Sequence, residues 1–177
     1  MTERALIHQI LSGDAEAFST LVELHYERCV RVATRILGNR EDAEEAVQDS
    51  FVRAFRALGE YEDRERFSAW LMRILVNQCR TRLTRTRRRE AVFSDVDPGD
   101  APWHAATQDV ANAWPDLDRA LASLPVEQRE AIVLRYSDDL TYEEMSRITG
   151  AGESALKMRV QRAFARLRAL LTEVPSV

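Results

Sequence analysis

The feature that most constrains the fold of this chain is a pair of helical segments around a glycine-rich turn, TYEEMSRITGAGESALKMRVQRAFARLR, at residues 141–168. Thr141 predicts the start of the first helix, because its hydroxyl can cap the helix while Glu144 completes a capping box. Gly150 and Gly152 predict the turn. Apolar residues of the second helix, which is predicted to run to about Glu173, then recur on one stripe. These residues are Leu156, Val160, Ala163, Phe164, Leu167 and Leu171.

Basic side chains flank this stripe on both sides. Arg159, Arg162 and Arg166 lie on one flank, and Lys157 and Arg168 lie on the other. This layout is typical of a helix-turn-helix whose second helix enters the major groove of DNA. An ordinary helical hairpin with a solvated basic face would show the same pattern, so both interpretations stay open at this point.

Charge is distributed unevenly along the chain. The whole chain has a net charge of −4, yet residues 80–90 contain six arginines and one glutamate, a net charge of +5. Residues 91–118 contain six aspartates and no lysine or arginine, and residues 141–177 have a net charge of +2. A protein that binds DNA unaided usually has a positive balance. Local basic segments on an acidic chain instead indicate DNA binding in the company of a partner.

Helical periodicity extends over the rest of the chain, and no β pattern of useful length is present. Two helical units are predicted, at residues 1–90 and 114–177, joined by a flexible acidic linker at residues 91–113 that contains proline and glycine. The predicted fold class is all-α, with an N-terminal helical bundle and a C-terminal four-helix domain that ends in the helix-turn-helix. The other predicted helices are Thr2–Ser12, Ala15–Leu37, Arg40–Leu58, Phe67–Arg85, Pro115–Ser123 and Val126–Ser137.

The helix predicted at residues 67–85 has a mixed outer face. One sector combines an indole, two guanidinium groups and an amide, from Trp70, Arg73, Asn77 and Arg80. Aromatic rings stack on unpaired bases, arginines bind phosphates, and amides read base edges. The sector therefore suits nucleic acid, although Trp70 could equally be a core residue at the edge of the sector.

The helix predicted at residues 40–58 places Phe51 and Phe55 on its inner stripe and acidic residues on its outer side. Acidic residues in the first turns also suit the helix dipole, so charge alone favours a solvated face. Only Val52, an apolar residue amid the charges, indicates a surface for a partner.

No cofactor is expected from the sequence. Cys29 and Cys79 form no C-x-x-C pair and predict no disulfide framework, and His25 with Cys29 would leave a metal site two ligands short. The chain lacks a long apolar run and a signal-peptide segment, so we expect a cytoplasmic protein without membrane insertion. No nucleophile–base pair, paired-carboxylate cleft or phosphate loop indicates an enzyme.

Four segments, taken in order, resemble those of the extracytoplasmic-function (ECF) sigma factors, the two-domain subunits that direct bacterial RNA polymerase to promoters. They are DAEEAVQDSF at 42–51, FSAWLMRILVN at 67–77, LPVEQR at 124–129, and YEEM with LKMRVQRA at 142–163. Each segment alone is a modest signal. Together, in this order and with a linker between the two halves, they are a strong one, and they cover nearly the whole chain.

The resemblance implies three contact surfaces. The helix at 40–58 would dock on a coiled coil of the largest subunit of the polymerase, through Asp42, Glu45, Gln48, Asp49, Val52 and Arg53. The following loop and helix would recognise and open the −10 promoter element, through Tyr61, Arg64, Phe67, Trp70, Arg73, Asn77 and Arg80. The second helix of the helix-turn-helix would read the −35 element, through Ser154, Lys157, Met158, Arg159, Arg162 and Arg166. The implied partners are core RNA polymerase, promoter DNA and an anti-sigma factor.

Gly152 and Ala155 depart from the usual pattern of the family, in which a proline or capping serine and a small hydroxyl residue are common at these positions, so no −35 sequence can be transferred. The main alternative is a stand-alone helix-turn-helix regulator, usually a dimer on palindromic sites. It leaves the segments at 42–51 and 67–77 unexplained, and the net charge of −4 fits it poorly. A pure interaction protein is a further alternative.

Overall fold

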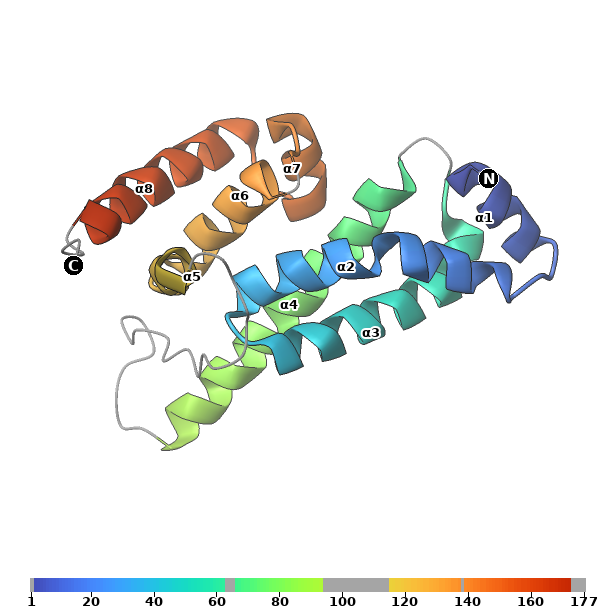
Figure 1. Cartoon of the computed structure of the whole chain (residues 1–177), viewed down its shortest axis with the longest axis horizontal. Coiled ribbons are helices and arrows are strands. Elements are labelled where there is room, and N and C mark those ends of the chain that lie inside the picture. Colours follow the sequence, from blue (N-terminus) through green and yellow to red (C-terminus); the bar gives the residue numbers. More distant parts are fainter. Residues whose placement is uncertain (1, 63–65, 94–114, 138, 173–177) are drawn as a thin grey trace.

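The computed structural model describes residues 2–62, 66–93, 115–137 and 139–172. Within these residues all regular structure is helical, which confirms the predicted all-α class (Figure 1). Most of the predicted linker lies outside the described residues, and so does Arg64. The helices form an N-terminal unit and a C-terminal unit, and the two units lie against each other (Figure 1).

The N-terminal unit packs α2, α3 and α4 side by side, with α1 on one end of α2 (Figure 1). Local capping explains its boundaries. The side chain of Asn39 accepts a 2.9 Å hydrogen bond from the backbone of Glu41 and starts α3. Gly38 ends α2 with a φ of 76°, a conformation that glycine adopts without strain. The elements are α1 (Glu3–Leu11), α2 (Ala17–Leu37), α3 (Arg40–Ala57), the 3-10 turn η1 (Leu58–Glu60) and α4 (Phe67–Phe93).

The C-terminal unit contains the predicted helix-turn-helix. The Thr141 hydroxyl accepts a 3.2 Å hydrogen bond from the backbone of Glu144, and the Thr141 backbone donates a 2.9 Å bond to the Glu144 carboxylate. The bonds that the Thr141 backbone and hydroxyl donate to the Glu144 carboxylate hold the pKa of Glu144 below its ordinary value. Gly150, with a φ of 73°, ends the first helix. The elements are α5 (Pro115–Ala122), α6 (Val126–Tyr136), α7 (Tyr142–Thr149) and α8 (Glu153–Thr172).

Helix α4 is longer than the sequence-based prediction. It continues to Phe93 instead of ending near Arg85, so it runs three residues into the predicted linker. The added segment, TRRREAVF, contains neither glycine nor proline, and arginine, glutamate and alanine are good helix formers. Helix propensity therefore prevails over repulsion between the neighbouring arginines.

Three residues predicted on buried stripes are exposed. Phe55, Phe164 and Leu171 are 44%, 47% and 40% exposed, which makes these three predictions wrong. They lie at the edges of their stripes, where a long side chain extends past the core. Phe164 packs edge-to-face on Tyr136, with ring centroids 5.1 Å apart, and Phe55 packs on Phe18 at 5.0 Å.

The contact between the two units was not predicted from the sequence. Helix α2 contacts α5 and α6, and α4 contacts α7. Arg129 of α6 is 2% exposed and donates to the backbone oxygens of Ile36 at 3.0 Å and Leu124 at 3.3 Å. Ile36 lies in the last turn of α2, where carbonyl groups lack partners within the helix. Arg129 thus links the units at a point where a buried charge needs hydrogen-bond acceptors.

Candidate functional site

Helix α8 presents the residues predicted to read the −35 element away from the core. Its buried side, formed by Leu156, Val160, Ala163 and Leu167, packs on the other helices of the C-terminal unit. Arg159 is partly covered. The exposed residues are Ser154, Lys157, Met158, Arg162 and Arg166. All six predicted residues therefore lie off the buried stripe, as a helix that enters a DNA groove requires.

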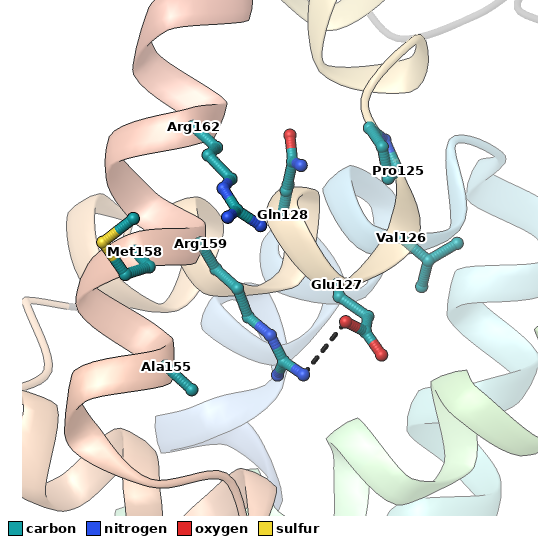
Figure 2. Close-up of a pocket in the computed structure, with 8 residues that line it drawn as sticks. All are labelled: Pro125, Val126, Glu127, Gln128, Ala155, Met158, Arg159 and Arg162. Carbon is teal, nitrogen blue, oxygen red and sulfur yellow. Dashed lines mark ion pairs between the residues drawn. The ribbon is translucent and has the colours of Figure 1, made fainter.

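Two basic groups of α8 interact within the C-terminal unit. The Arg159 Nη2 atom lies 2.9 Å from the Glu127 Oε2 atom, across a cleft of about 500 Å³ between α8 and the start of α6 (Figure 2). The Lys157 ammonium lies 3.9 Å from the Glu153 carboxylate and 5.5 Å from the ring centroid of Tyr142. The lining residues of the cleft are Pro125, Val126, Glu127, Gln128, Ala155, Met158, Arg159 and Arg162.

The aromatic residues predicted to contact the −10 element form one cluster. The ring centroids of Tyr61 and Trp70 are 5.2 Å apart, and the Phe67 centroid lies 5.9 Å from Tyr61 and 5.6 Å from Trp70. Phe67 and Trp70 are 1% and 9% exposed. In this conformation both rings are part of the core, so contact with a base would require the cluster to open. Their contact with DNA stays a prediction.

The polar residues of this predicted −10 surface lie further along α4. Asn77 is exposed and Arg73 is half-buried. Arg80 contacts the C-terminal unit: its Nε and Nη2 atoms donate to the two carboxylate oxygens of Glu130 at 2.8 and 2.6 Å. Its Nη1 atom donates to the backbone oxygen of Thr149 at 3.0 Å. The hydrogen bonds to Glu130 raise the pKa of Arg80.

The predicted polymerase-docking face on α3 is organised by a residue that sequence reasoning did not single out. Arg82 of α4 lies 2.6 Å from the Glu45 carboxylate, 3.1 Å from that of Asp49 and 3.8 Å from that of Asp42. Burial lowers the pKa of Arg82, but the bonds to Glu45 and Asp49 raise it above its ordinary value overall. The other three predicted docking residues, Gln48, Val52 and Arg53, are exposed.

The site residues predicted from the sequence did not include Arg82, Glu127, Arg129 and Glu130, all of which make long-range contacts in the structure. The sequence held one usable signal. Glu127 and Glu130 are three residues apart on a predicted helix, so they share a face. Their partners could not be identified from spacing.

Cys29 and Cys79 are buried, and burial raises the pKa of the Cys79 thiol to about 12. His25 pairs with Glu3, with Nε2 and Oε1 3.0 Å apart. Among the described residues, no group of three or more histidine, cysteine, aspartate or glutamate side chains is placed to hold a metal ion. No helix in the described ranges is long and apolar enough to cross a bilayer.

The fold and its surfaces define a two-unit helical protein with a helix-turn-helix in the second unit. Two family models match it: Sigma-70 region 2 over residues 21–89 and Sigma-70 region 4 over residues 115–167. The ECF RNA polymerase sigma factor SigM of Mycobacterium tuberculosis is 34% identical over 171 residues, covering 96% of this chain and 85% of the relative. The chain therefore belongs to the ECF sigma factors, which confirms the resemblance seen in the sequence.

Solved structures give the same result for both units. The sigma factor RpoE of Bartonella quintana, in complex with the anti-sigma factor NepR, matches with a TM-score of 0.72 and 29% identity, over 89% of this chain and 98% of that chain. CnrH, in complex with the cytosolic domain of CnrY, matches with a TM-score of 0.71 and 28% identity, over 98% and 99%. As a sigma factor, the chain is a transcription initiation factor that directs RNA polymerase to promoters.

Proposed function

We propose that the chain assigns its three functions to three surfaces: α3 binds core RNA polymerase, the segment from Tyr61 along α4 recognises the −10 element, and α8 reads the −35 element. The observation that carries the proposal is the placement of all six predicted residues of α8 off its buried stripe, within the segment that matches Sigma-70 region 4. A helix with this exposure can present side chains to base edges and phosphates in the major groove.

The charge of α3 supports a basic partner surface. Asp42, Glu45 and Asp49 lie three and four residues apart, so they share one helix face. Arg82 neutralises only one of their three charges, so these four side chains together have a net charge of −2, next to the exposed Val52 and Arg53. An acidic face with an apolar residue suits a cationic helix pair, such as a coiled coil on the polymerase.

The solved relatives support a regulated form of this activity. RpoE and CnrH are bound to NepR and to the cytosolic domain of CnrY, respectively. We infer that this chain, too, binds an anti-sigma factor and that it acts in the cytoplasm, together with the polymerase.

In vitro transcription tests the assignment. Core polymerase from the source bacterium is mixed with this chain and with fragments of its genomic DNA, and transcript starts are mapped. The expected result is a set of new starts that share two sequence elements upstream. Arg162→Ala should reduce these transcripts while polymerase still binds the chain, and Asp49→Arg should weaken binding to polymerase roughly tenfold or more. Failure of the unchanged chain to produce any new start would contradict the proposed function.

A further inference from the structure

The two units enclose a second cleft, of about 560 Å³, between α4, α6 and the helix-turn-helix. It holds one arginine from each predicted promoter-reading helix, Arg80 and Arg159, and two glutamates from one face of α6, Glu127 and Glu130. The remaining lining residues are Leu83, Thr84, Val126, Thr149, Gly150 and Ala151. Each arginine is paired with one of the glutamates. The two helices predicted to contact the promoter therefore meet at a cleft in which Arg80 and Arg159 are each already paired with a carboxylate.

The Arg80 contact has the geometry of phosphate recognition. A guanidinium group binds a carboxylate or a phosphate through two parallel hydrogen bonds, because both anions present two oxygens at a suitable separation. Glu130 occupies this position with bonds of 2.8 and 2.6 Å, and its side chain is only 3% exposed. The backbone oxygen of Thr149, at the end of α7, accepts a further hydrogen bond from the Nη1 atom of Arg80. A DNA phosphate cannot reach Arg80 in this geometry unless Glu130 leaves.

We propose that Glu130 is an intramolecular decoy for a DNA phosphate: it keeps the free chain closed and Arg80 unable to bind DNA, while Glu127 masks Arg159 within the C-terminal unit. This inference rests on the proposed function, since it takes Arg80 and Arg159 as promoter contacts. Partner binding that separates the units withdraws Glu130 from Arg80 and exposes the guanidinium to the DNA backbone. Glu127 forms an ion pair with Arg159 inside the C-terminal unit, with N and O atoms 2.9 Å apart.

Neighbouring contacts show that closure does not rest on one pair. Arg129, the residue before Glu130, fixes α6 against the end of α2 through the backbone oxygen of Ile36. Arg66, just before α4, pairs with Glu144 of α7, so a second arginine of the N-terminal unit also binds a carboxylate of the C-terminal unit. Both α6 and α7 thus present carboxylates to basic residues at or near α4. This arrangement explains locally how a chain with strongly basic segments can lack affinity for DNA when alone.

The test uses the full chain without polymerase. Glu130→Gln keeps the shape of the side chain and removes its charge. Asp116→Asn is the matched control, because it removes the same charge from an exposed pair with Arg119 inside α5, where the two side chains lie 3.6 Å apart. The probe is a fluorescent duplex of mixed sequence, since phosphate contacts do not depend on sequence. Anisotropy at several salt concentrations measures affinity, and small-angle X-ray scattering measures whether the units separate.

We expect Glu130→Gln to bind the duplex roughly tenfold more tightly than the unchanged chain, the effect of losing a charge-assisted contact. Its affinity should also depend more steeply on salt, by about one in the log–log slope for each arginine that gains a phosphate. Its radius of gyration should increase, and Asp116→Asn should change none of these quantities. Adding Glu127→Gln should increase affinity and slope further.

A folded Glu130→Gln chain that binds the duplex no better than Asp116→Asn would overturn the proposal, whether or not its radius increases. Should this variant lose its helical circular dichroism, Glu130→Asp takes its place, since the shorter side chain cannot keep both bonds. Tighter duplex binding than Asp116→Asn then supports the proposal, and equal binding overturns it. Run-off transcription with core polymerase separates the two hypotheses. If no variant supports transcription but Glu130→Gln gains duplex affinity, the proposed function fails while the decoy stands.

Discussion

Replacing Arg129 with methionine measures how much the buried hydrogen bonds of this residue, one across the two units and one within the C-terminal unit, contribute to stability. The guanidinium is 2% exposed and donates bonds of 3.0 Å to the Ile36 oxygen and 3.3 Å to the Leu124 oxygen. A bond donated by a charged group contributes about 1.5–3 kcal/mol, so two contribute about 3–6 kcal/mol. Methionine also removes the desolvation cost of the charge, which offsets part of the loss. We expect Arg129→Met to lower the free energy of unfolding by about 2–4 kcal/mol.

Urea denaturation followed by circular dichroism measures this change through the shift of the midpoint at constant slope. The control is Arg119→Met, the same substitution at a side chain that is 73% exposed and lies 3.6 Å from its partner Asp116. An exposed pair of this kind contributes little, so the control should stay within about 0.5 kcal/mol of the unchanged chain. Equal effects of the two substitutions would refute the reasoning, because the buried contact would then contribute no more than an exposed one.

Three further outcomes are expected. Arg162→Ala should lower run-off transcription from promoters with a −35 element roughly tenfold, with polymerase binding unchanged, whereas Arg168→Ala on the other flank of α8 should have a smaller effect; equal losses would contradict the proposed reading face. Asp49→Arg should weaken binding to core polymerase roughly tenfold or more in a titration, since it reverses a charge on the docking face, and Asp116→Arg should not. Burial raises the pKa of Cys79 from 9.0 to about 12, so its contribution to stability is present below pH 9 and declines as the pH rises toward 12. Thermal melts of Cys79→Ala should lack this part of the alkaline decline, and an unaltered decline would argue against the effect of burial.

The helix boundaries could be predicted because the residues that fix them are local. Thr141 and Glu144 are three residues apart, and Gly150 ends α7 with a positive φ. Both helices of the helix-turn-helix accordingly lie within one residue of the prediction at each end. The end of α4 was misplaced because no glycine or proline marks it, and the arginine run that follows Arg85 is compatible with both a helix and a linker.

The candidate site could be predicted only where helical phase decides exposure. The outward side of α8 follows from the positions of its apolar residues. The burial of Trp70 does not follow, because a ring at the edge of a stripe fits both the core and the surface, and Tyr61 covers it from a preceding loop. The contact of Arg80 with Glu130 spans 50 residues. No periodicity relates two charges at that separation, since each would look equally solvated on its own helix.

For the closed arrangement to serve as a reversible state, its free energy must lie within the range that a binding partner can supply. Moving a two-state equilibrium from one per cent open to 99 per cent open requires about 5.5 kcal/mol of differential binding. Among the described residues, the polar contacts between the units include the bond from Arg129 to the Ile36 oxygen, the bonds of Arg80 to Glu130 and Thr149, the bond of Arg35 to Ser137 and the pair of Arg66 with Glu144. They add to the packing of α2 on α5 and α6 and of α4 on α7. Each charge-assisted bond contributes about 1.5–3 kcal/mol, but desolvation of Arg129 and solvent screening at Arg80, whose side chain is 36% exposed, reduce the sum. A tightly bound polymerase can provide differential binding of this order. A single DNA phosphate that displaces Glu130 exchanges one such contact for another of similar strength. Opening is therefore expected to depend on the polymerase first and on DNA second, which is the order that an acidic chain with locally basic reading helices requires.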